Sequence, residues 1–447
     1  MALSLLVASL LASCAVTPYQ VPALVAPAAF DGAGAAAQAT TNPQWWSAFR
    51  DPALDQLVAL GLAQNLTVLQ AVERIKEAMA NAGIAAASGQ PQIGLSANAG
   101  MTDPSGGASV TVEAASTNLS WMLDLFGRVA SAKAGSHAQL DAAYASADVA
   151  RIALAGEVAS AYVDLRYYQA RMALTRESLT SRRKTADLVQ SAFTAGASTK
   201  LDTLRADQLI AIADAQMPAL EVGYAQALNR LATLTGQGSA ALAGVLRRGG
   251  QPVPHFRASV GVPADVLRQR PDVIVAERGL ASAYAAVGVA RADLYPTLTL
   301  GGTITASGLA GGKATTVQSF GPSLNLPLFT GGKVRNNISA AQSRAAQAQL
   351  AWQAAVLNAV EEIQNALAAY GRDGRNMAAQ ERLMSISVQT LDLARSSFQI
   401  GQGDFLSVLE AERTLLDARA ALADANRARA LNFIRLSVAT ADGVTVR

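Results

Sequence analysis

The chain has 447 residues and a formal net charge of +3 at pH 7, with 51% hydrophobic and 15% charged residues. This length suits one very large domain or two to three ordinary ones, and the absence of any Lys/Arg run argues against nucleic-acid binding. Beyond the N-terminus no stretch of about 18 residues lacks polar residues, which argues against a membrane-spanning helix. The same argument does not apply to a membrane β-barrel, because barrel strands alternate in polarity and give only a weak hydropathy signal.

The sequence offers few groups for catalysis or metal binding. Cys14 is the only cysteine, so neither an intrachain disulfide nor a cysteine-based metal cluster can form. The two histidines, His137 and His255, lie in an Ala/Gln-rich stretch and a Pro-rich loop, and we expect them to be solvent-facing or packed. Glu361 and Glu362 are adjacent on an expected helix and therefore face apart. With no Gly-rich phosphate loop either, we expect no enzymatic activity, metal or dissociable cofactor.

Residues 1–13, MALSLLVASLLAS, form an apolar stretch that is too short to span a bilayer and fits a lipoprotein signal peptide, although no Lys or Arg precedes it. The stretch ends in the apolar-small-small-Cys pattern of a lipobox, completed by Cys14. We expect cleavage before Cys14 and a covalent lipid on it, with several acyl chains giving durable anchoring. The residue after Cys14 is Ala15 and not Asp, which in the common bacterial sorting pattern favours the outer over the inner membrane. Residues 14–44, rich in Pro and Ala, are expected to form a lipidated tether.

The two halves of the chain align at a constant offset of 205 residues without a gap. Chance gives one or two such matches, but hardly the same Gly, Pro and Phe markers in the same order. The chain is therefore a tandem duplication, with a first repeat at 45–240, a linker at 241–262 and a second repeat at 263–441. Corresponding residues are Gly83/Gly288, Pro91/Pro296, Gly127/Gly332, Arg128/Lys333, Phe193/Phe398, Gly196/Gly401 and Leu204/Leu409.

Each repeat has the same expected order of elements. A helix comes first, and a hairpin of two alternating strands around a Gly-rich turn follows it. A very long helix then leads through a Gly-containing turn into a return helix. In the first repeat the expected ranges are 52–88, then hairpin 92–123 (strands 92–102 and 109–123), then helical hairpin 128–235 (helices 128–194 and 201–235). In the second they are 264–293, then hairpin 297–328 (strands 297–307 and 315–328), then helical hairpin 333–439 (helices 333–399 and 404–439).

The long helices carry heptad-like spacing, as in Val356, Val360, Ile363, Leu367 and Tyr370. Such spacing indicates coiled-coil packing, and Ala allows neighbouring helices to approach closely. A helix of about 67 residues is roughly 100 Å long, which a globular core cannot house. We therefore expect an elongated bundle or tube.

The strands constrain how the chain assembles. Two hairpins give four strands, and an open four-stranded sheet would expose unpaired edges that lipid cannot satisfy. Each strand is about as long as one that crosses a membrane at a tilt. We therefore expect several subunits to share one barrel, and three copies would give 12 strands, within the known size range.

Several segments carry a resemblance to a known family: Trp45–Phe49 with Asp51–Leu54, Leu119–Trp121 with Leu123–Arg128, Arg270–Val273, Gly288–Arg291 with Leu294–Pro296, and Gly321–Leu324 with Leu326–Phe329 and Gly331–Gly332. In these segments the chain resembles the TolC-like outer membrane factors, specifically the NodT-type lipoprotein branch found with resistance-nodulation-division efflux pumps. The resemblance covers essentially the whole mature chain. It implies an α+β membrane protein in which a homotrimer combines a 12-stranded transmembrane β-barrel, four strands per subunit, with a long α-helical coiled-coil tube.

The two helical turns are the first candidate sites. Their residues include expected C-cap glycines and carboxylates that suit the next helix N-terminus. The resemblance implies that these turns form a periplasmic tip where the tube narrows and an adaptor docks. Asp202 and Asp404 are the gate candidates, because a ring of carboxylates favours cations. The candidates for adaptor docking are Gly196, Leu201, Leu204, Gly401, Phe405 and Leu409.

The strand–helix junctions are the second candidate sites. Gly127, Gly331 and Gly332 would permit the sharp change of backbone direction, and a turn role for them is expected before any ligand role. Arg128 and Lys333 would place cations at the lipid interface.

These observations predict the outer-membrane channel of a tripartite efflux system in a Gram-negative bacterium, lipid-anchored and with a large periplasmic part. The implied partners are a periplasmic membrane-fusion adaptor, a resistance-nodulation-division transporter in the inner membrane, and outer-membrane lipid, with no nucleic acid. One alternative is the outer duct of a type I protein secretion system. Another is a periplasmic coiled-coil scaffold lipoprotein without a pore, which would have no use for barrel strands.

Overall fold

A computed structural model of the chain describes residues 19–24, 27, 30, 44–103, 109–247, 249–255 and 263–441. The predicted signal peptide, Cys14 and most of the predicted tether lie outside the described residues.

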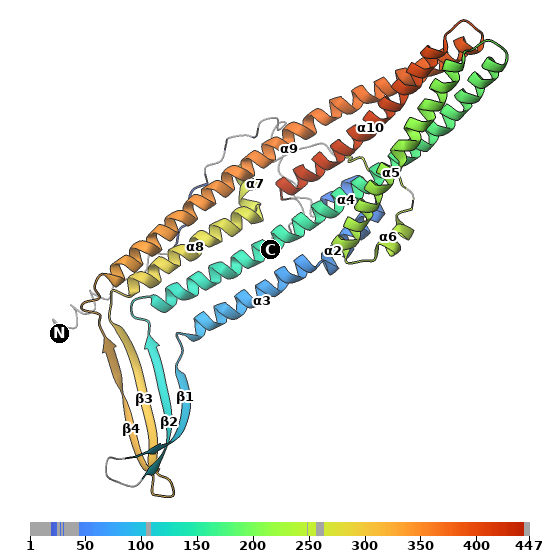
Figure 1. Ribbon diagram of the computed structural model, residues 1–447. Coiled ribbons are helices and arrows are strands. Elements are labelled where there is room, and N and C mark those ends of the chain that lie inside the picture. The colour runs from blue at the N-terminus through green and yellow to red at the C-terminus, as the bar shows by residue number, and fades with distance from the viewer. Residues whose placement is uncertain are drawn as a thin grey trace. The chain divides into compact units, whose positions relative to one another are not determined.

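Both repeats fold into the expected series of elements (Figure 1). The first holds η1 (Trp45–Phe49), α2 (Pro52–Gln64), α3 (Leu66–Ala87), β1 (Gln92–Thr102), β2 (Val110–Leu123), α4 (Arg128–Thr194) and α5 (Lys200–Thr235). The second holds α7 (Pro263–Gln269), α8 (Pro271–Ala292), β3 (Thr297–Leu309), β4 (Thr315–Asn325), α9 (Lys333–Gln399) and α10 (Phe405–Ala439). Both long helices have the bounds that the sequence predicts.

The observed elements differ from the predicted ones in a few details, among them β3, which extends two residues beyond the predicted end at 307. The first helix of each repeat is broken, at Asn65 and at Arg270, two positions that are 205 residues apart. Asn65 is extended and its Oδ1 accepts from the backbone N–H of Thr67, so it begins a new helix. Arg270 precedes Pro271, which disfavours helical backbone before it and suits the first helical position. The predicted linker contains part of a short helix, α6 (Ser239–Val245), and β4 ends three residues before the predicted Leu328.

The four strands form one antiparallel sheet in the order β1-β2-β3-β4. Gln92 lies opposite Ser120 in the first hairpin, and Thr297 lies opposite Asn325 in the second. These two pairs are related by the 205-residue offset, so both hairpins have the same register. The central pair β2·β3 joins the two repeats, and β1 and β4 are the edge strands.

The chain divides into two compact units, and neither coincides with a repeat. The first unit comprises 1–23, 72–146 and 272–355, and therefore contains the sheet, most of α3, most of α8 and the parts of α4 and α9 that adjoin the strands. The second comprises 24–71, 147–271 and 356–447, and contains both helical turns. Each unit draws on both repeats, because the corresponding elements of the two repeats pack on each other.

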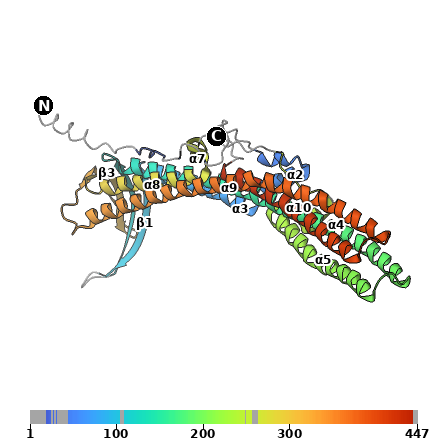
Figure 2. The same ribbon diagram turned by 90° about the horizontal axis from the view of Figure 1, so that it is seen from above.

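Within the first unit α8 lies beside α4 and α9 (Figures 1 and 2). Gly135 of α4 faces Ala285 of α8 so closely that a Cβ on Gly135 would lie 3.3 Å from the alanine methyl. On its other side α8 buries Val287 and Ala290 against Ala341 and Ala345 of α9. Among the described helices α8 alone is long and apolar enough to cross a membrane by length and composition, but its apolar residues serve this helix packing.

The second unit has a core built from all four long helices. Val189 of α4, Ala206 of α5 and Leu391 of α9 pack with Phe405, Val408, Ala411 and Leu415 of α10. The predicted heptad positions of α9 are buried at Val356, Ile363, Leu367 and Tyr370. This confirms the coiled-coil interpretation at those positions. Trp45 of η1, 2% exposed, packs edge-on against Phe433 of α10 with ring centroids 6.1 Å apart.

Candidate functional site

The sheet has one apolar and one polar face. Because side chains alternate along a strand, the register assigns every second residue to the same face. The mainly apolar face carries Ile93, Leu95, Ala97, Ala99 and Met101 of β1; Leu119, Trp121 and Leu123 of β2; Leu298, Leu300 and Ile304 of β3; and Phe320, Pro322 and Leu324 of β4, and it also carries the polar Thr111, Glu113, Thr117, Thr316 and Gln318. The mainly polar face carries Ser96, Asn98 and Thr102 of β1; Ser116, Asn118 and Ser120 of β2; Thr299, Thr303 and Thr305 of β3; and Ser319, Ser323 and Asn325 of β4, and it also carries the apolar Val110, Val112, Met122, Leu309 and Val317. The polar side chains bond across strands, as Ser116 Oγ does with Thr305 Oγ1 at 3.0 Å.

The two edge strands are exposed along their whole length. Large apolar side chains on both edges face solvent, with 77% of Leu95 and 68% of Phe320 exposed. Exposed apolar edge strands of this length are an aggregation hazard in a soluble protein, whereas a closed barrel removes both edges. The sheet is therefore suited to a position in which lipid covers one face and further strands cover both edges.

The junction between β2 and α4 is held by several contacts. Gly127 has φ +75°, a conformation that other residues rarely adopt, so its predicted turn role agrees with its backbone. Arg128 forms an ion pair with Asp293, in the turn that connects α8 to β3. Phe126 stacks on Tyr295 of the same turn, with ring centroids 4.8 Å apart. The first-repeat junction is thus tied to the second repeat.

The equivalent junction between β4 and α9 is exposed to solvent. Gly331 and Gly332 have φ +57° and +86°, which again permits the reversal of direction, and Lys333 is exposed. The preceding Leu328 and Phe329 are 89% and 93% exposed. The first junction stacks its half-buried aromatic residue, Phe126, on the neighbouring repeat, while the second exposes Phe329 to solvent.

The first helical turn fixes Asp202 by hydrogen bonds. Thr199 begins α5 as N-cap, and Asp202 accepts from the Thr199 hydroxyl at 2.6 Å and from its backbone N–H at 3.0 Å. These bonds from Thr199, helped by Ser198 and Arg205, hold the pKa of the Asp202 carboxyl below its ordinary value. Gly196 precedes the turn with φ +76°. Asp202 is thus a capping residue that remains ionised at neutral pH.

The second turn fixes Asp404 in a different way. Asp404 is itself the N-cap of α10 and accepts from the Ser407 hydroxyl at 2.5 Å and the Ser407 backbone N–H at 2.9 Å. Both bonds hold the pKa of this exposed carboxyl below its ordinary value. Gly401 ends the preceding helix with φ +75°. Each turn therefore carries one ionised carboxylate at the start of a return helix.

The six residues predicted for docking do not all lie on a surface. Gly196 and Gly401 are exposed, and Leu201 and Leu204 are each 54% exposed. Phe405 is only 4% exposed, and the half-buried Leu409 packs against the same core cluster. Phe405 and Leu409 therefore support the turn from inside, as part of the core cluster to which α4, α5, α9 and α10 all contribute.

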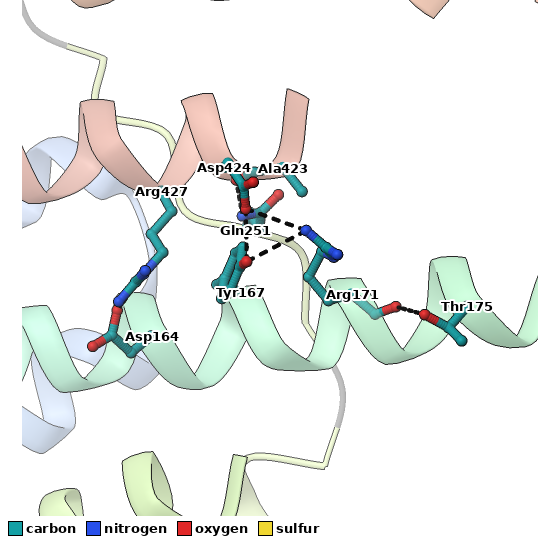
Figure 3. Close-up of polar contacts among 8 residues, drawn as sticks. All are labelled: Asp164, Tyr167, Arg171, Thr175, Gln251, Ala423, Asp424 and Arg427. Atoms are coloured by element: carbon teal, nitrogen blue, oxygen red, sulfur yellow. Dashed lines mark hydrogen bonds and ion pairs between the residues drawn. The ribbon is translucent and has the colours of Figure 1, made fainter. Parts of the chain in front are cut away.

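A polar network that no sequence pattern indicates joins α4 to α10 in the second unit (Figure 3). Tyr167 donates to Asp424 at 2.6 Å, and Arg171 donates to the same carboxylate at 3.3 Å. One turn away Arg427 donates to Asp164 at 2.7 Å and lies over the Tyr167 ring. Burial, with the bond to Asp424, raises the pKa of Tyr167 to about 12, so its hydroxyl stays a donor at physiological pH.

Nearer the turns, Glu412 of α10 is buried between charged and hydroxyl partners. Its Oε1 accepts from Arg395 of α9 at 2.6 Å and from Thr185 of α4 at 2.5 Å. This ties three helices together through one carboxylate. Among the described residues no three His, Cys, Asp or Glu side chains are grouped as metal ligands.

Comparisons with known proteins agree with this architecture. The family described as "Outer membrane efflux protein" matches residues 57–237 and 262–442, two segments with the same 205-residue offset. "Nodulation protein T" of Rhizobium leguminosarum bv. trifolii is 40% identical over 97% of this chain and 95% of its own length. "Outer membrane protein OprJ" of Pseudomonas aeruginosa is 32% identical over 98% of this chain and 95% of that protein. The solved structure of the outer-membrane channel OprN superposes with a TM-score of 0.88 at 30% identity, covering 96% of this chain and 99% of that one.

Proposed function

Because the chain belongs to the outer membrane efflux protein family, we propose that it is the outer-membrane channel component of a tripartite efflux system. It conducts substrates passively from a periplasmic adaptor and an inner-membrane transporter to the exterior. The transporter supplies the energy, and a resistance-nodulation-division pump is the type that the resemblance of the sequence implies.

The observation that carries this proposal is the two-faced sheet with two unpaired edges. One copy cannot close a barrel with four strands, so further copies must supply strands to both edges. Three copies give a barrel of 12 strands, with the apolar face towards lipid and the Ser/Thr/Asn face towards a water-filled lumen. A homotrimer is the assembly that follows.

A covalent lipid on Cys14 adds a second attachment to the outer membrane. The lipobox that ends at Cys14 supports it, and several acyl chains anchor more durably than one. The helical turns would then lie in the periplasm, where Gly196, Leu201, Leu204 and Gly401 offer surface for the adaptor. Asp202 and Asp404 would supply the carboxylates of a cation-favouring constriction.

Two other functions fit less well. Export of polypeptides by a type I secretion system would use a similar duct, but the family is named for efflux. A periplasmic scaffold without a pore would gain nothing from a sheet whose apolar face and edges are exposed.

The native mass of the full-length protein, extracted from outer membranes in detergent, tests the proposed assembly. The expected result is a particle that contains three copies of the chain, recovered from the outer-membrane fraction. A monomer that fractionates with soluble periplasmic proteins would contradict the proposal and favour the scaffold.

A further inference from the structure

The sequence repeat and the observed strand register together predict which residues meet where two copies join. We infer that β4 of one copy pairs with β1 of the next in a single register that places Asn325 opposite Ser96, Ser323 opposite Asn98 and Leu328 opposite Ile93. This inference rests on the proposed shared barrel and assigns its inter-subunit seam residue by residue. The partner is a second copy of this chain, because the two edges belong to opposite sides of one sheet (Figure 1).

The register follows from the repeat. Both hairpins obey the 205-residue offset, since Gln92 opposite Ser120 becomes Thr297 opposite Asn325. Among the described strands, β2·β3 is the one pair in which the first hairpin meets the second. In a closed ring of copies, β4 meets β1 of the next copy in the same way that β2 meets β3. Adding 205 to the number of a β2 residue gives the corresponding β4 residue, and subtracting 205 from the number of its β3 partner gives the corresponding β1 residue. Each observed β2·β3 pair therefore predicts one β4·β1 pair between two copies.

The transformation gives definite pairs. Ser120 opposite Gly301 becomes Asn325 opposite Ser96, and Asn118 opposite Thr303 becomes Ser323 opposite Asn98. On the other face, Ala115 opposite Ala306 becomes Phe320 opposite Met101, and Trp121 opposite Leu300 becomes Leu326 opposite Leu95.

The ends of the strands support this seam independently. The β1·β2 pairing stops at Ser120, and the β3·β4 pairing stops at Asn325, 205 residues later. β2 nevertheless continues to Leu123, because Trp121, Met122 and Leu123 pair with β3. The corresponding Leu326, Pro327 and Leu328 have no further strand beside them in one chain, and β4 ends at Asn325. The seam supplies the missing strand, and it brings the 89% exposed Leu328 opposite the 74% exposed Ile93.

The side chains also agree in polarity. In this register one face of the seam pairs Ile93 with Leu328, Leu95 with Leu326, Ala97 with Leu324, Ala99 with Pro322 and Met101 with Phe320. The other face pairs Ser96 with Asn325, Asn98 with Ser323 and Thr102 with Ser319. A slip of one residue in either direction would put Ala97, Ala99 and Met101 opposite Ser, Asn or Gly residues of the other face. Slips of two residues keep this polarity, so an experiment must separate them.

Cysteine cross-linking can do so with four positions on the polar face. The matched pairs are Ser96→Cys with Asn325→Cys, and Asn98→Cys with Ser323→Cys. The mismatched pairs exchange partners: Ser96→Cys with Ser323→Cys, and Asn98→Cys with Asn325→Cys. Directly opposed residues have Cα atoms about 4.5–5.5 Å apart, within disulfide range, whereas diagonal neighbours lie about 7–8 Å apart. All variants keep Cys14, so the unaltered chain and the four single variants serve as controls.

Full-length variants in outer membranes are treated with a mild oxidant and resolved on a denaturing gel without reductant. We expect both matched pairs to convert most of the protein into covalent species of up to three chains, and both mismatched pairs to stay near the single-variant background. If a mismatched pair cross-links and the matched pairs do not, the register is wrong although the shared barrel stands. If none of the four pairs cross-links while the protein is membrane-inserted, the seam itself is overturned, and a monomeric native mass would then also remove the proposed function.

Discussion

Asn65 and Arg270 lie 205 residues apart and make the same hydrogen bond in the two repeats. Asn65 Nδ2 donates to the carbonyl oxygen of Leu234 at 3.0 Å, and Arg270 Nη1 donates to that of Ala439 at 2.6 Å. Leu234 and Ala439 are also 205 residues apart and lie at the ends of α5 and α10. Each repeat thus uses the break in its first helix to cap the end of its return helix. Arg270 extends the device with an ion pair to Glu362 at 2.7 Å.

Removal of these caps should lower stability. We expect Arg270→Ala and Asn65→Ala each to reduce the free energy of unfolding by about 1–3 kcal/mol, because a buried helix-end carbonyl loses its donor. Thermal unfolding of the detergent-purified protein, followed by circular dichroism, measures the change. Arg268→Ala is the control, since Arg268 lies two residues before the break and is exposed to solvent. An unchanged midpoint for Arg270→Ala would mean that water replaces the bond at no cost.

The network in Figure 3 predicts a graded loss of stability. Tyr167→Phe removes one hydrogen bond to Asp424 and should cost about 0.5–1.5 kcal/mol. Asp424→Ala also removes the acceptor of Arg171 and should cost more. The same thermal measurement ranks the variants. Tyr224→Phe is the matched control, because the Tyr224 hydroxyl makes no hydrogen bond with any described residue. Equal effects of Tyr167→Phe and Tyr224→Phe would deny the network any role.

The turn carboxylates should control ion preference. Asp202→Asn and Asp404→Asn remove charge, and Asn at position 404 keeps an N-cap, so the turns remain folded. We expect the double variant to show a cation-to-anion permeability ratio closer to one than the unaltered channel, while Asp214→Asn on α5 leaves it unchanged. Reversal potentials across a salt gradient give the ratio.

The pH dependence of the same ratio follows from the lowered pKa of both carboxyls. A lowered pKa means that each carboxylate keeps its charge as the pH falls, and is protonated only below its ordinary range of about pH 4. Cation preference should therefore persist from pH 7 to pH 5 and decline below about pH 4. A decline centred near pH 6 would point to other groups.

Cys14→Ala should abolish incorporation of labelled fatty acid without releasing the protein from the membrane. In the proposed barrel the sheet itself inserts into the membrane, so the variant should resist extraction at alkaline pH. Tyr19 lies five residues after Cys14 and packs its ring 5.7 Å from that of Tyr284, which keeps the start of the described chain on α8. Continued labelling of Cys14→Ala, measured on the purified chain, would place the lipid elsewhere.

Much of the fold could be predicted from the sequence because its signals are local. Period-two alternation locates β1 at 92–102, and the heptads and Gly196 or Gly401 delimit helices of 67 residues. The 205-residue offset is also visible without a structure. What could not be predicted depends on packing between distant segments. In the sequence Phe405 looks like a surface residue of a turn. It is buried because α4, α5 and α9 pack around it in the folded chain.

Arg270 gives the same lesson for side-chain roles. Arg270 is followed by a proline and an aspartate, and this local pattern indicates only that a helix starts there. Its hydrogen-bond partners could not be predicted, because they lie 92 and 169 residues away in the chain. The offset could have revealed it, because Asn65 occupies the same place in the first repeat. Tyr167 and Asp424 have no such marker, since their contact exists only once α4 and α10 pack together.

The most direct test of a shared, conducting barrel is the single-channel conductance of the purified full-length trimer in planar lipid bilayers. We expect discrete, cation-preferring openings, from the unaltered protein or, if its turns close the lumen, from the Asp202→Asn and Asp404→Asn double variant. A membrane-inserted oligomer that passes no current in either form would contradict the account.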